Sequence, residues 1–257
     1  MVSQGSITAM IVQVILGVLI PVALVLYFRR TTGISYRAIG VGILVFFIFS
    51  QVLEKGMHYY VLSFNKSTAA WFKNPWLFAL YGGLAAGIFE EVGRWLGFTF
   101  LLKNRQQRKD GISLGIGHGG IEAFLIAIVS GVQGIIFATM INAGKLEESL
   151  GAGLPPEQIA ELKNRLIQTA QSEFWLGGLE RIPAIFMQIA FSLIVLYGVR
   201  NRKVVYLLYA ILLHALVDFA PAMYQAHFLS LWVAEAVIWI LGIGAIVVIV
   251  KSKKWFA

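Results

Sequence analysis

The sequence predicts an all-α membrane protein, a polytopic bundle of about seven transmembrane helices. The 257 residues are 58% hydrophobic and only 13% charged. Their mean hydropathy of +0.77 lies far above the range of soluble domains. The apolar residues gather in runs long enough to cross the ~30 Å of bilayer hydrocarbon. Most lysines and arginines stand at the ends of these runs, as topology determinants do.

The charge and the missing cysteine exclude several classes of function. The net charge of +8 is spread over the ends of apolar runs, which indicates contact with anionic lipid headgroups and not with nucleic acid. Without cysteine, the chain has no disulfides, no thiol nucleophile and no thiolate metal ligands. We expect a multi-pass protein of a bacterial plasma membrane, folded as a single integral membrane domain over residues 1–257.

Seven apolar runs predict the spans. No basic segment precedes the first run and Arg29 and Arg30 follow it, so we interpret it as an uncleaved helix and not a signal peptide. In chain order the predicted spans are Ile7–Phe28, Tyr36–Leu62, Trp76–Leu102, Ser113–Ile141, Leu176–Val199, Val204–Pro221 and Leu229–Val250.

The only sizeable extramembrane insertion is predicted over residues 142–175. Pro155, Pro156 and Glu157 are typical of a helix start, because proline fits the first turn and a carboxylate favours the positive end of the helix dipole. Apolar residues then recur at helical spacing, which predicts an amphipathic helix. It could be a cap on the membrane surface, or a lid that guides substrate. The apolar positions are Ile159, Leu162, Leu166 and Ala170.

Lysine and arginine counts predict the orientation. Loops on one side of the predicted membrane hold thirteen of these residues and loops on the other side hold five. The basic side is expected to be cytoplasmic. The N-terminus is therefore predicted outside and the C-terminus in the cytoplasm, with the amphipathic helix on the outer side.

The third run contains ionisable residues in its apolar interior. Glu90, Glu91 and Arg94 lie within the stretch Phe89–Trp95, where each would cost several kcal/mol in hydrocarbon unless paired, hydrated or bound to metal. Glu90 and Arg94 are four residues apart and share a helical face, whereas Glu91 points about 100° away. One carboxylate is therefore expected to pair with the arginine while the other faces a different partner.

Two further runs carry a histidine and an acid four residues apart, namely His118 with Glu122 and His214 with Asp218. Each pair could supply two metal ligands, or a base and its orienting partner. Counted at ~1.5 Å per residue from the cytoplasmic ends, Glu91, Glu122 and His214 all lie roughly 16 Å deep. Three helices are thus expected to bring these groups to one level of the membrane.

Other interpretations remain open for these residues. A histidine within a span can be a hydrogen-bonded packing residue, and His58 is equally open to that interpretation. The Glu90–Glu91–Arg94 group could be an ion-pair network that only fixes helix packing. The outer acids and arginine are expected to form a structural network; they are Glu54, Glu180, Arg181 and Glu235. Small residues every fourth position beside His118 predict close helix packing; they are Gly111, Gly115, Gly119, Ala123, Ala127 and Gly131.

The motifs resemble a known superfamily. Glu90-Glu91-x-x-Arg94 in one span, Gly117-His118-Gly119-Gly120-Ile121-Glu122 in the next and His214-Ala-Leu-Val-Asp218 in a late span look like the CAAX-prenyl-protease and bacteriocin-processing (CPBP or ABI) proteins. The chain is most similar to their YhfC branch, a relative of PrsW. The resemblance covers roughly residues 80–220.

This resemblance implies an intramembrane metalloprotease, a metal-dependent endopeptidase that acts on a membrane-associated protein or peptide. One carboxylate of the Glu90–Glu91 pair would activate water, with Arg94 beside it, and either glutamate could be the base. His118 and His214 would bind a divalent metal, expected to be zinc, or polarise the substrate. Asp218 matches the superfamily's final Asn/Asp, and Glu122 is a further candidate ligand without a counterpart in the commoner pattern.

Two other functions fit the same residues. A cation- or proton-coupled carrier would also place acids across the membrane depth, and would tolerate the loss of one histidine better than an enzyme. A catalytically inactive scaffold of the same fold would bind no metal. Metal analysis of the purified protein is the most informative measurement for choosing among the three.

The predicted orientation can be tested with reporter fusions. Fusions after Arg30, Lys109, Lys203 and Lys254 should report the cytoplasm, and a fusion within residues 147–173 should report the outside, because lysine and arginine are retained on the cytoplasmic side. A cytoplasmic signal from the 147–173 segment would overturn the depth argument for the site.

Overall fold

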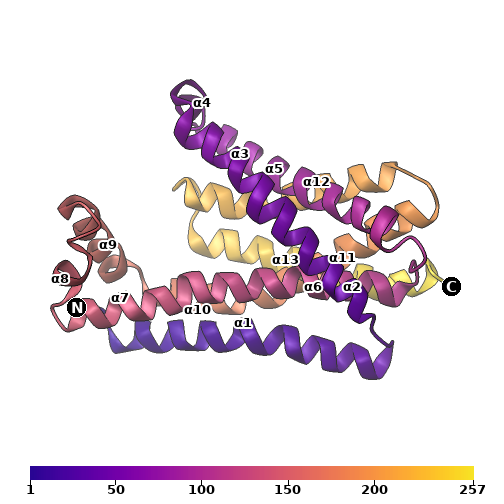
Figure 1. Cartoon of the computed structure of the whole chain (residues 1–257), viewed down its shortest axis with the longest axis horizontal. Coiled ribbons are helices and arrows are strands. Elements are labelled where there is room, and N and C mark those ends of the chain that lie inside the picture. The colour runs from indigo at the N-terminus through magenta and orange to yellow at the C-terminus, as the bar shows by residue number, and fades with distance from the viewer. The chain divides into compact units, whose positions relative to one another are not determined.

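A computed structural model describes all residues from 1 to 257 and contains helices without any β-strand (Figure 1). The all-helical membrane fold predicted from composition is thereby confirmed. The chain divides into two compact units, one of residues 1–20 with 123–181 and one of residues 21–122 with 182–257.

Six helical segments are long and apolar enough to cross a membrane, and they match six of the seven predicted spans. The first is α1 (Gln4–Thr31), the fifth is α11 (Arg181–Arg200) with the preceding α10 (Gln171–Leu179), and the last two are α12 (Val205–Gln225) and α13 (Leu231–Lys251). The third predicted span is the exception. It forms α5 (Pro75–Leu96) and η3 (Gly97–Leu101), but Glu90, Glu91 and Arg94 lower its hydropathy.

The second and fourth spans are each built from several consecutive helical segments. The second comprises α2 (Tyr36–Val45), η1 (Phe46–Glu54), α3 (Lys55–Tyr59) and η2 (Tyr60–Phe64). The fourth comprises α6 (Arg108–Ile126), η4 (Ala127–Val132) and α7 (Gln133–Asn142). The η segments are π-helical turns, in which the hydrogen bonds reach one residue further and the helix widens. A short helix that the sequence reasoning did not predict, α4 (Lys66–Trp71), is capped by Asn65.

The first unit contains the insertion. Residues 142–175 form α8 (Leu146–Leu150), α9 (Pro156–Gln168) and the start of α10. The predicted amphipathic helix is confirmed as α9, with Pro156 in its first turn and Ile159 buried. The insertion packs on α7 and on the start of α1. There the side chain of Asn142 accepts from the Val2 N–H and donates to the Val2 carbonyl. The buried apolar residues are Val2, Met10, Ala138, Ile141, Leu146 and Ile159.

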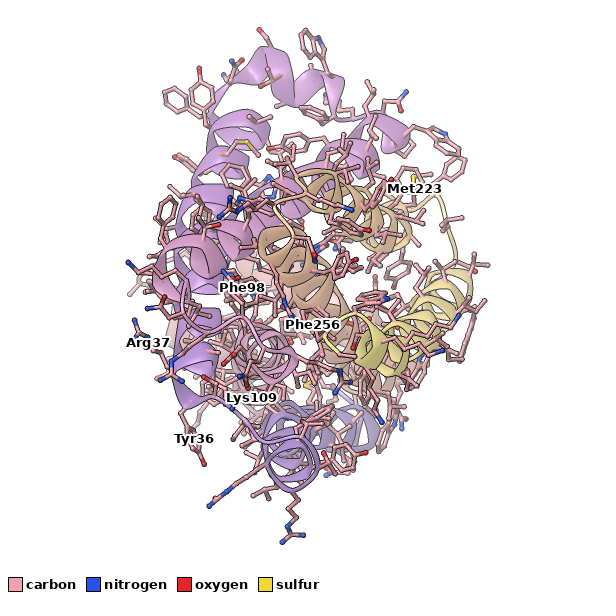
Figure 2. All side chains as sticks on the ribbon, turned by 90° about the vertical axis from the view of Figure 1, so that its right-hand side faces the viewer. Tyr36, Arg37, Phe98, Lys109, Met223 and Phe256 are labelled. Carbon is pink, nitrogen blue, oxygen red and sulfur yellow. The ribbon has the colours of Figure 1, made fainter.

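The second unit packs α2, α5, α6, α11 and α12 around an apolar core near one end of these helices. Figure 2 looks at this end, where Arg37, Lys109 and Phe256 lie beside the start of α2, the start of α6 and the chain terminus. Many large apolar side chains on the outer helix faces remain exposed, as expected of surfaces that face lipid. The core residues are Ala38, Val41, Val45, Phe98, Leu102, Leu114, Ile194, Val195, Leu196 and Ala210.

Glycines set the close helix contacts of this unit. A Cβ added at Gly87 of α5 would lie 2.6 Å from the carbonyl oxygen of Ile211 in α12, and one at Gly115 of α6 would lie 2.4 Å from the Cα of Ile189 in α11. Gly119 follows one turn later against Gln188. The predicted small-residue face of the fourth span is therefore a helix contact. The glycines thus bring the backbone of α6 close to that of α11, and the backbone of α5 close to that of α12.

Alanine substitutions test this packing. Gly87→Ala should destabilise the protein by about 1–3 kcal/mol, because the added methyl cannot fit against the α12 backbone. Gly40→Ala is the matched control, since its Cβ would meet no atom within 4 Å, and it should be neutral or stabilising by about 1 kcal/mol through helix propensity. Thermal unfolding in detergent measures both, and equal melting temperatures for the two variants would contradict the close contact.

Candidate active site

The site is built on α5. Asn74 caps this helix by accepting from the backbone N–H groups of Trp76 and Leu77, and Pro75 occupies its first turn. Near the opposite end, Glu90, Glu91 and Arg94 are all buried, with Glu91 and Arg94 fully excluded from solvent. Three ionisable groups are thus held on one helix, away from water.

Arg94 joins the two carboxylates. Its guanidinium donates to Glu91 and to Gln188 of α11, and it lies 3.2 Å from Glu90 Oε2. The expectation that only one glutamate would pair with the arginine is wrong. Residues three and four positions apart are both neighbours on a helix, so one long guanidinium reaches Glu91 and Glu90 together.

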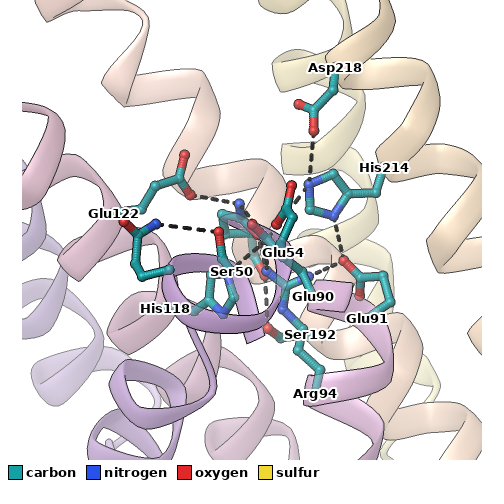
Figure 3. A network of polar contacts seen from close by, with 12 residues as sticks. Ser50, Glu54, Glu90, Glu91, Arg94, His118, Glu122, Ser192, His214 and Asp218 are labelled. Carbon is teal, nitrogen blue, oxygen red and sulfur yellow. Dashed lines mark hydrogen bonds and ion pairs between the residues drawn. The ribbon is translucent and has the colours of Figure 1, made fainter. Parts of the chain in front are cut away.

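Glu90 stands at the centre of the cluster (Figure 3). Its Oε2 lies 2.8 Å from His118 Nε2, 3.7 Å from His214 Nε2 and 3.5 Å from Gln188 Nε2. Four helices, α5, α6, α11 and α12, therefore contribute polar groups around one carboxylate oxygen. The sequence-based expectation that separate spans bring acids and imidazoles together agrees with this geometry.

The ring of His214 is held between carboxylates. Its Nδ1 lies 2.6 Å from Glu91 Oε1, and its Nε2 lies 3.4 Å from Asp218 Oδ2 one turn along α12. Figure 3 shows the ring bridging Glu91 and Asp218. Phe191 stacks on one face, with ring centroids 4.8 Å apart. Both ring nitrogens thus face acceptor oxygens. This position suits a doubly protonated ring, or a ring that is protonated at Nδ1 and binds a cation through Nε2.

His118 has a different environment. It is fully buried and packs edge-on against Phe46, with ring centroids 5.0 Å apart. Its Nε2 faces Glu90, but its Nδ1 is buried without a hydrogen-bond partner. A neutral imidazole that donates from Nε2 leaves only a lone pair at Nδ1, which costs less than an unpaired N–H. The structure therefore suits His118 as a donor to Glu90.

The two outer acids occupy the edge of the cluster. Glu122 accepts from Gln188 Nε2 at 2.7 Å, and Gln188 links it to Glu90. His118, which lies on the same helix as Glu122, pairs with Glu90 directly. The Asp218 side chain is 36% exposed, against 4% for His214 and 7% for Glu90. The cluster consequently approaches the surface at Asp218.

A second polar group lies on the second span. Glu54 at the end of η1 is buried and is drawn with the cluster in Figure 3. Its Oε1 lies 3.2 Å from His58 Nε2, and His58 Nδ1 lies 2.8 Å from the hydroxyl of Tyr81. His58 is thus a hydrogen-bonded packing residue with an acidic and a phenolic partner.

Sequence reasoning missed Gln188. This side chain touches Arg94, Glu90 and Glu122, and so links most of the cluster. One signal was present, because an amide in the middle of the apolar run 176–199 is costly in lipid unless it bonds within the bundle. Which groups it bonds depends on side-chain direction and could not be read from spacing.

The donor types fit a metal such as zinc, which prefers imidazole nitrogen and carboxylate oxygen in the absence of thiolates. Ligand atoms around a tetrahedral zinc lie about 3.3 Å apart, and His214 Nε2 lies 3.4 Å from Asp218 Oδ2 and 3.7 Å from Glu90 Oε2. His214 also has the carboxylate behind Nδ1 that metal-bound histidines usually have. No group of three or more such side chains is arranged as a complete ligand set; the contacts are those of a hydrogen-bonded cluster.

Comparisons with known proteins identify the family of the chain. The family model described as YhfC intramembrane metalloprotease matches residues 15–239. The chain is 39% identical to the uncharacterized membrane protein YhfC of Bacillus subtilis (strain 168), over the full length of both chains. No solved structure matches significantly. The family's description implies a divalent metal.

Replacing Arg94 tests how strongly the cluster depends on it. Arg94→Ala should lower the free energy of unfolding by about 3–5 kcal/mol, because Glu90 and Glu91 would remain buried without their shared cation. Arg94→Lys should recover part of this loss, since it keeps the charge but not the forked donor. Thermal or denaturant unfolding in detergent gives the values.

The control is Arg30→Ala, which removes an exposed arginine near the end of α1 and should change stability by less than about 0.5 kcal/mol. If Arg94→Ala unfolds like this control, then the carboxylates are not buried against Arg94 and the ion-pair interpretation fails.

Proposed function

The chain belongs to the YhfC family of intramembrane metalloproteases, and from this membership and the buried cluster we propose that it is an endopeptidase. It would cleave a membrane-associated protein or peptide by water attack, with Glu90 as general base. The observation that carries the proposal is the position of Glu90 Oε2, which faces the Nε2 atoms of both His118 and His214.

Glu90 is preferred over Glu91 as the base. Glu91 is fully buried and its Oε1 is already bonded to Arg94 and His214, so it has no path to a water molecule. Glu90 keeps a small exposed fraction and sits between the two imidazoles. A general base must reach the proton that it removes, and Glu90 is the carboxylate of the pair that meets this condition.

Glu91 would instead position His214. By accepting from Nδ1 it fixes the tautomer and turns Nε2 toward Glu90 and Asp218. Arg94 and Gln188 hold the two carboxylates at a fixed distance on α5. The base and the electrophilic imidazoles are thus oriented before substrate arrives, which is where much of an enzyme's rate enhancement originates.

The reaction would then use these residues in order. Glu90 Oε2 accepts a proton from the attacking water, and the hydroxyl oxygen bonds to the scissile carbonyl carbon. His214 and His118 would serve the charge on the carbonyl oxygen as ligands of the metal proposed below, and not as direct hydrogen-bond donors, because each has only one Nε2. Glu90 then returns its proton to the departing amine nitrogen as the C–N bond breaks.

We propose zinc as the metal. His214 and His118 would hold it through Nε2, and Asp218 would supply a carboxylate ligand at the exposed edge. Glu122 would take part indirectly, by accepting a hydrogen bond from Gln188. When bound, zinc lowers the pKa of water toward ~7 and polarises carbonyls. A cation here also compensates charge, because Glu90, Glu91 and Asp218 face only one arginine.

A carrier remains the second candidate because of one observation. Glu54, His58 and Tyr81 extend the polar groups beyond the cluster, as a proton or cation path would. The two functions predict different variants. A carrier should lose transport when Glu54 is replaced by Gln, whereas the peptidase should keep most of its activity because Glu54 does not contact Glu90 or the two cluster histidines in the proposed reaction.

The peptidase proposal is tested by comparing new protein N-termini in membranes of cells that express the wild type or Glu90→Gln. Cleavage products should appear only with the wild type, since loss of a general base lowers rates by about 10²–10⁴-fold. Zinc content, measured by mass spectrometry on the purified protein, should stay in Glu90→Gln. It should fall in His214→Ala, which removes a ligand and abolishes cleavage as well.

The matched control is Glu161→Gln, an exposed carboxylate on α9 that should leave cleavage and zinc unchanged. Stoichiometric zinc in both His118→Ala and His214→Ala would reject the metal assignment. Identical N-termini in wild type and Glu90→Gln would reject the peptidase.

A further inference from the structure

A pocket of about 800 Å³ lies in the second unit, away from the acidic cluster. It is formed where four segments meet, namely the end of α1, the loop before α6, the end of α11 and the chain terminus. Figure 2 shows Lys109 and Phe256 on this face. The main lining residues are Lys103, Gln107, Arg108, Lys109, Arg200 and Phe256.

The lining is strongly basic. Four cationic side chains line the pocket and no carboxylate does, while Thr32, Asn104 and two glutamines add neutral hydrogen-bonding groups. Four like charges around one cavity repel one another. An anion in the cavity would reduce this repulsion. The first turn of α6 adds the positive end of a 19-residue helix.

Two of the cations are held in place by the fold. Arg108 donates from Nε to Ser252 Oγ at 2.9 Å and from a terminal nitrogen to the carbonyl of Ile249 at 2.8 Å. Arg200 lies over the ring of Phe256, 5.6 Å from its centroid. Both guanidinium groups are thus oriented without any ligand, which reduces the entropy lost on binding.

An acid close to the pocket, Asp110, is not among its lining residues. Asp110 lines a smaller neighbouring cavity, which shares Asn104, Gln107 and Lys109 with the first. Its Oδ2 accepts from the backbone N–H of Gln107 at 3.0 Å and so shapes the turn that enters α6. Its carboxylate is only 2% exposed. Its role is to hold the loop that carries Lys109 and Gln107.

We propose that this pocket binds a phosphate group, as the headgroup of an anionic phospholipid or as a free phosphate-bearing anion. The helices that frame it are apolar enough to cross the bilayer and end here, which sets the pocket at the level of lipid phosphates. Basic pockets between the ends of membrane helices are a recurrent way to bind such headgroups. Phe256 provides an apolar wall beside the cations.

The experiment uses the whole protein in detergent and follows its melting temperature. Short-chain phosphatidylglycerol, phosphatidylcholine of equal chain length and inorganic phosphate are added separately at constant ionic strength. Phosphatidylglycerol should stabilise the wild type and phosphatidylcholine should not, because only the first carries a net negative charge. Phosphate that stabilises alone and displaces the lipid identifies a general phosphate site; stabilisation by phosphatidylglycerol alone identifies a lipid site.

Two triple variants locate the effect. Lys103→Gln, Lys109→Gln and Arg200→Gln together remove pocket charges, whereas Lys203→Gln, Lys253→Gln and Lys254→Gln remove equal charge from exposed positions outside the pocket. The pocket variant should bind phosphatidylglycerol roughly a hundredfold more weakly than the control. The reason is that each of the three removed cations contributes a factor of about five to the affinity. If the pocket variant does not fold, Lys109→Gln alone should bind about fivefold more weakly than Lys203→Gln.

Equal losses in the pocket and control variants would mean that the basic loops attract anions without a site, and would overturn the proposal. The proposal would also be overturned if neither phosphatidylglycerol nor phosphate raised the melting temperature of the wild type. The references are phosphatidylcholine for the lipid and chloride at equal ionic strength for phosphate.

Discussion

The contact of Arg94 with both Glu90 and Glu91 is the constraint on which the rest of the second unit depends. A charged triad with side chains 0–7% exposed survives in an apolar bundle only when its polar atoms find partners. Those partners come from three other helices, as His118, Gln188 and His214. The backbones must approach closely for these side chains to meet, which explains why Gly87 and Gly115 face neighbouring helices where no Cβ would fit.

The same argument explains how much could be predicted from the sequence. The spans, the amphipathic helix and the small-residue face follow from periodicity and composition, because lipid leaves few alternatives to long apolar helices. Grouping His118 and His214 with the glutamates rested on depth along each helix. Depth is predictable, since a helix rises by a constant distance per residue. The predicted single domain and the orientation stay predictions.

The pairing within the cluster could not be predicted. Spacing suggested His118 with Glu122 and Arg94 with Glu90, because residues four apart are helix neighbours. The structure places His118 against Glu90, Glu122 against Gln188 and Arg94 against both glutamates. These choices depend on how α6 and α11 are rotated about their axes, which spacing within one helix does not reveal. The π-helical turns η1 and η4, which widen the second and fourth spans locally, were not predicted from the sequence either.

Exposure differs across the cluster, which is sealed at its centre and partly open at Asp218 and Glu122. Arg94 and Glu91 are sealed, Glu90 and His214 are nearly so, and Asp218 is open over about a third of its side chain. Asp218 is therefore one point at which water can reach the cluster. The sealed end keeps the electrostatic interactions strong, since few water dipoles screen them there. The open end allows exchange with the outside. A polar site in a membrane protein needs both, and here one turn of α12, from His214 to Asp218, separates them.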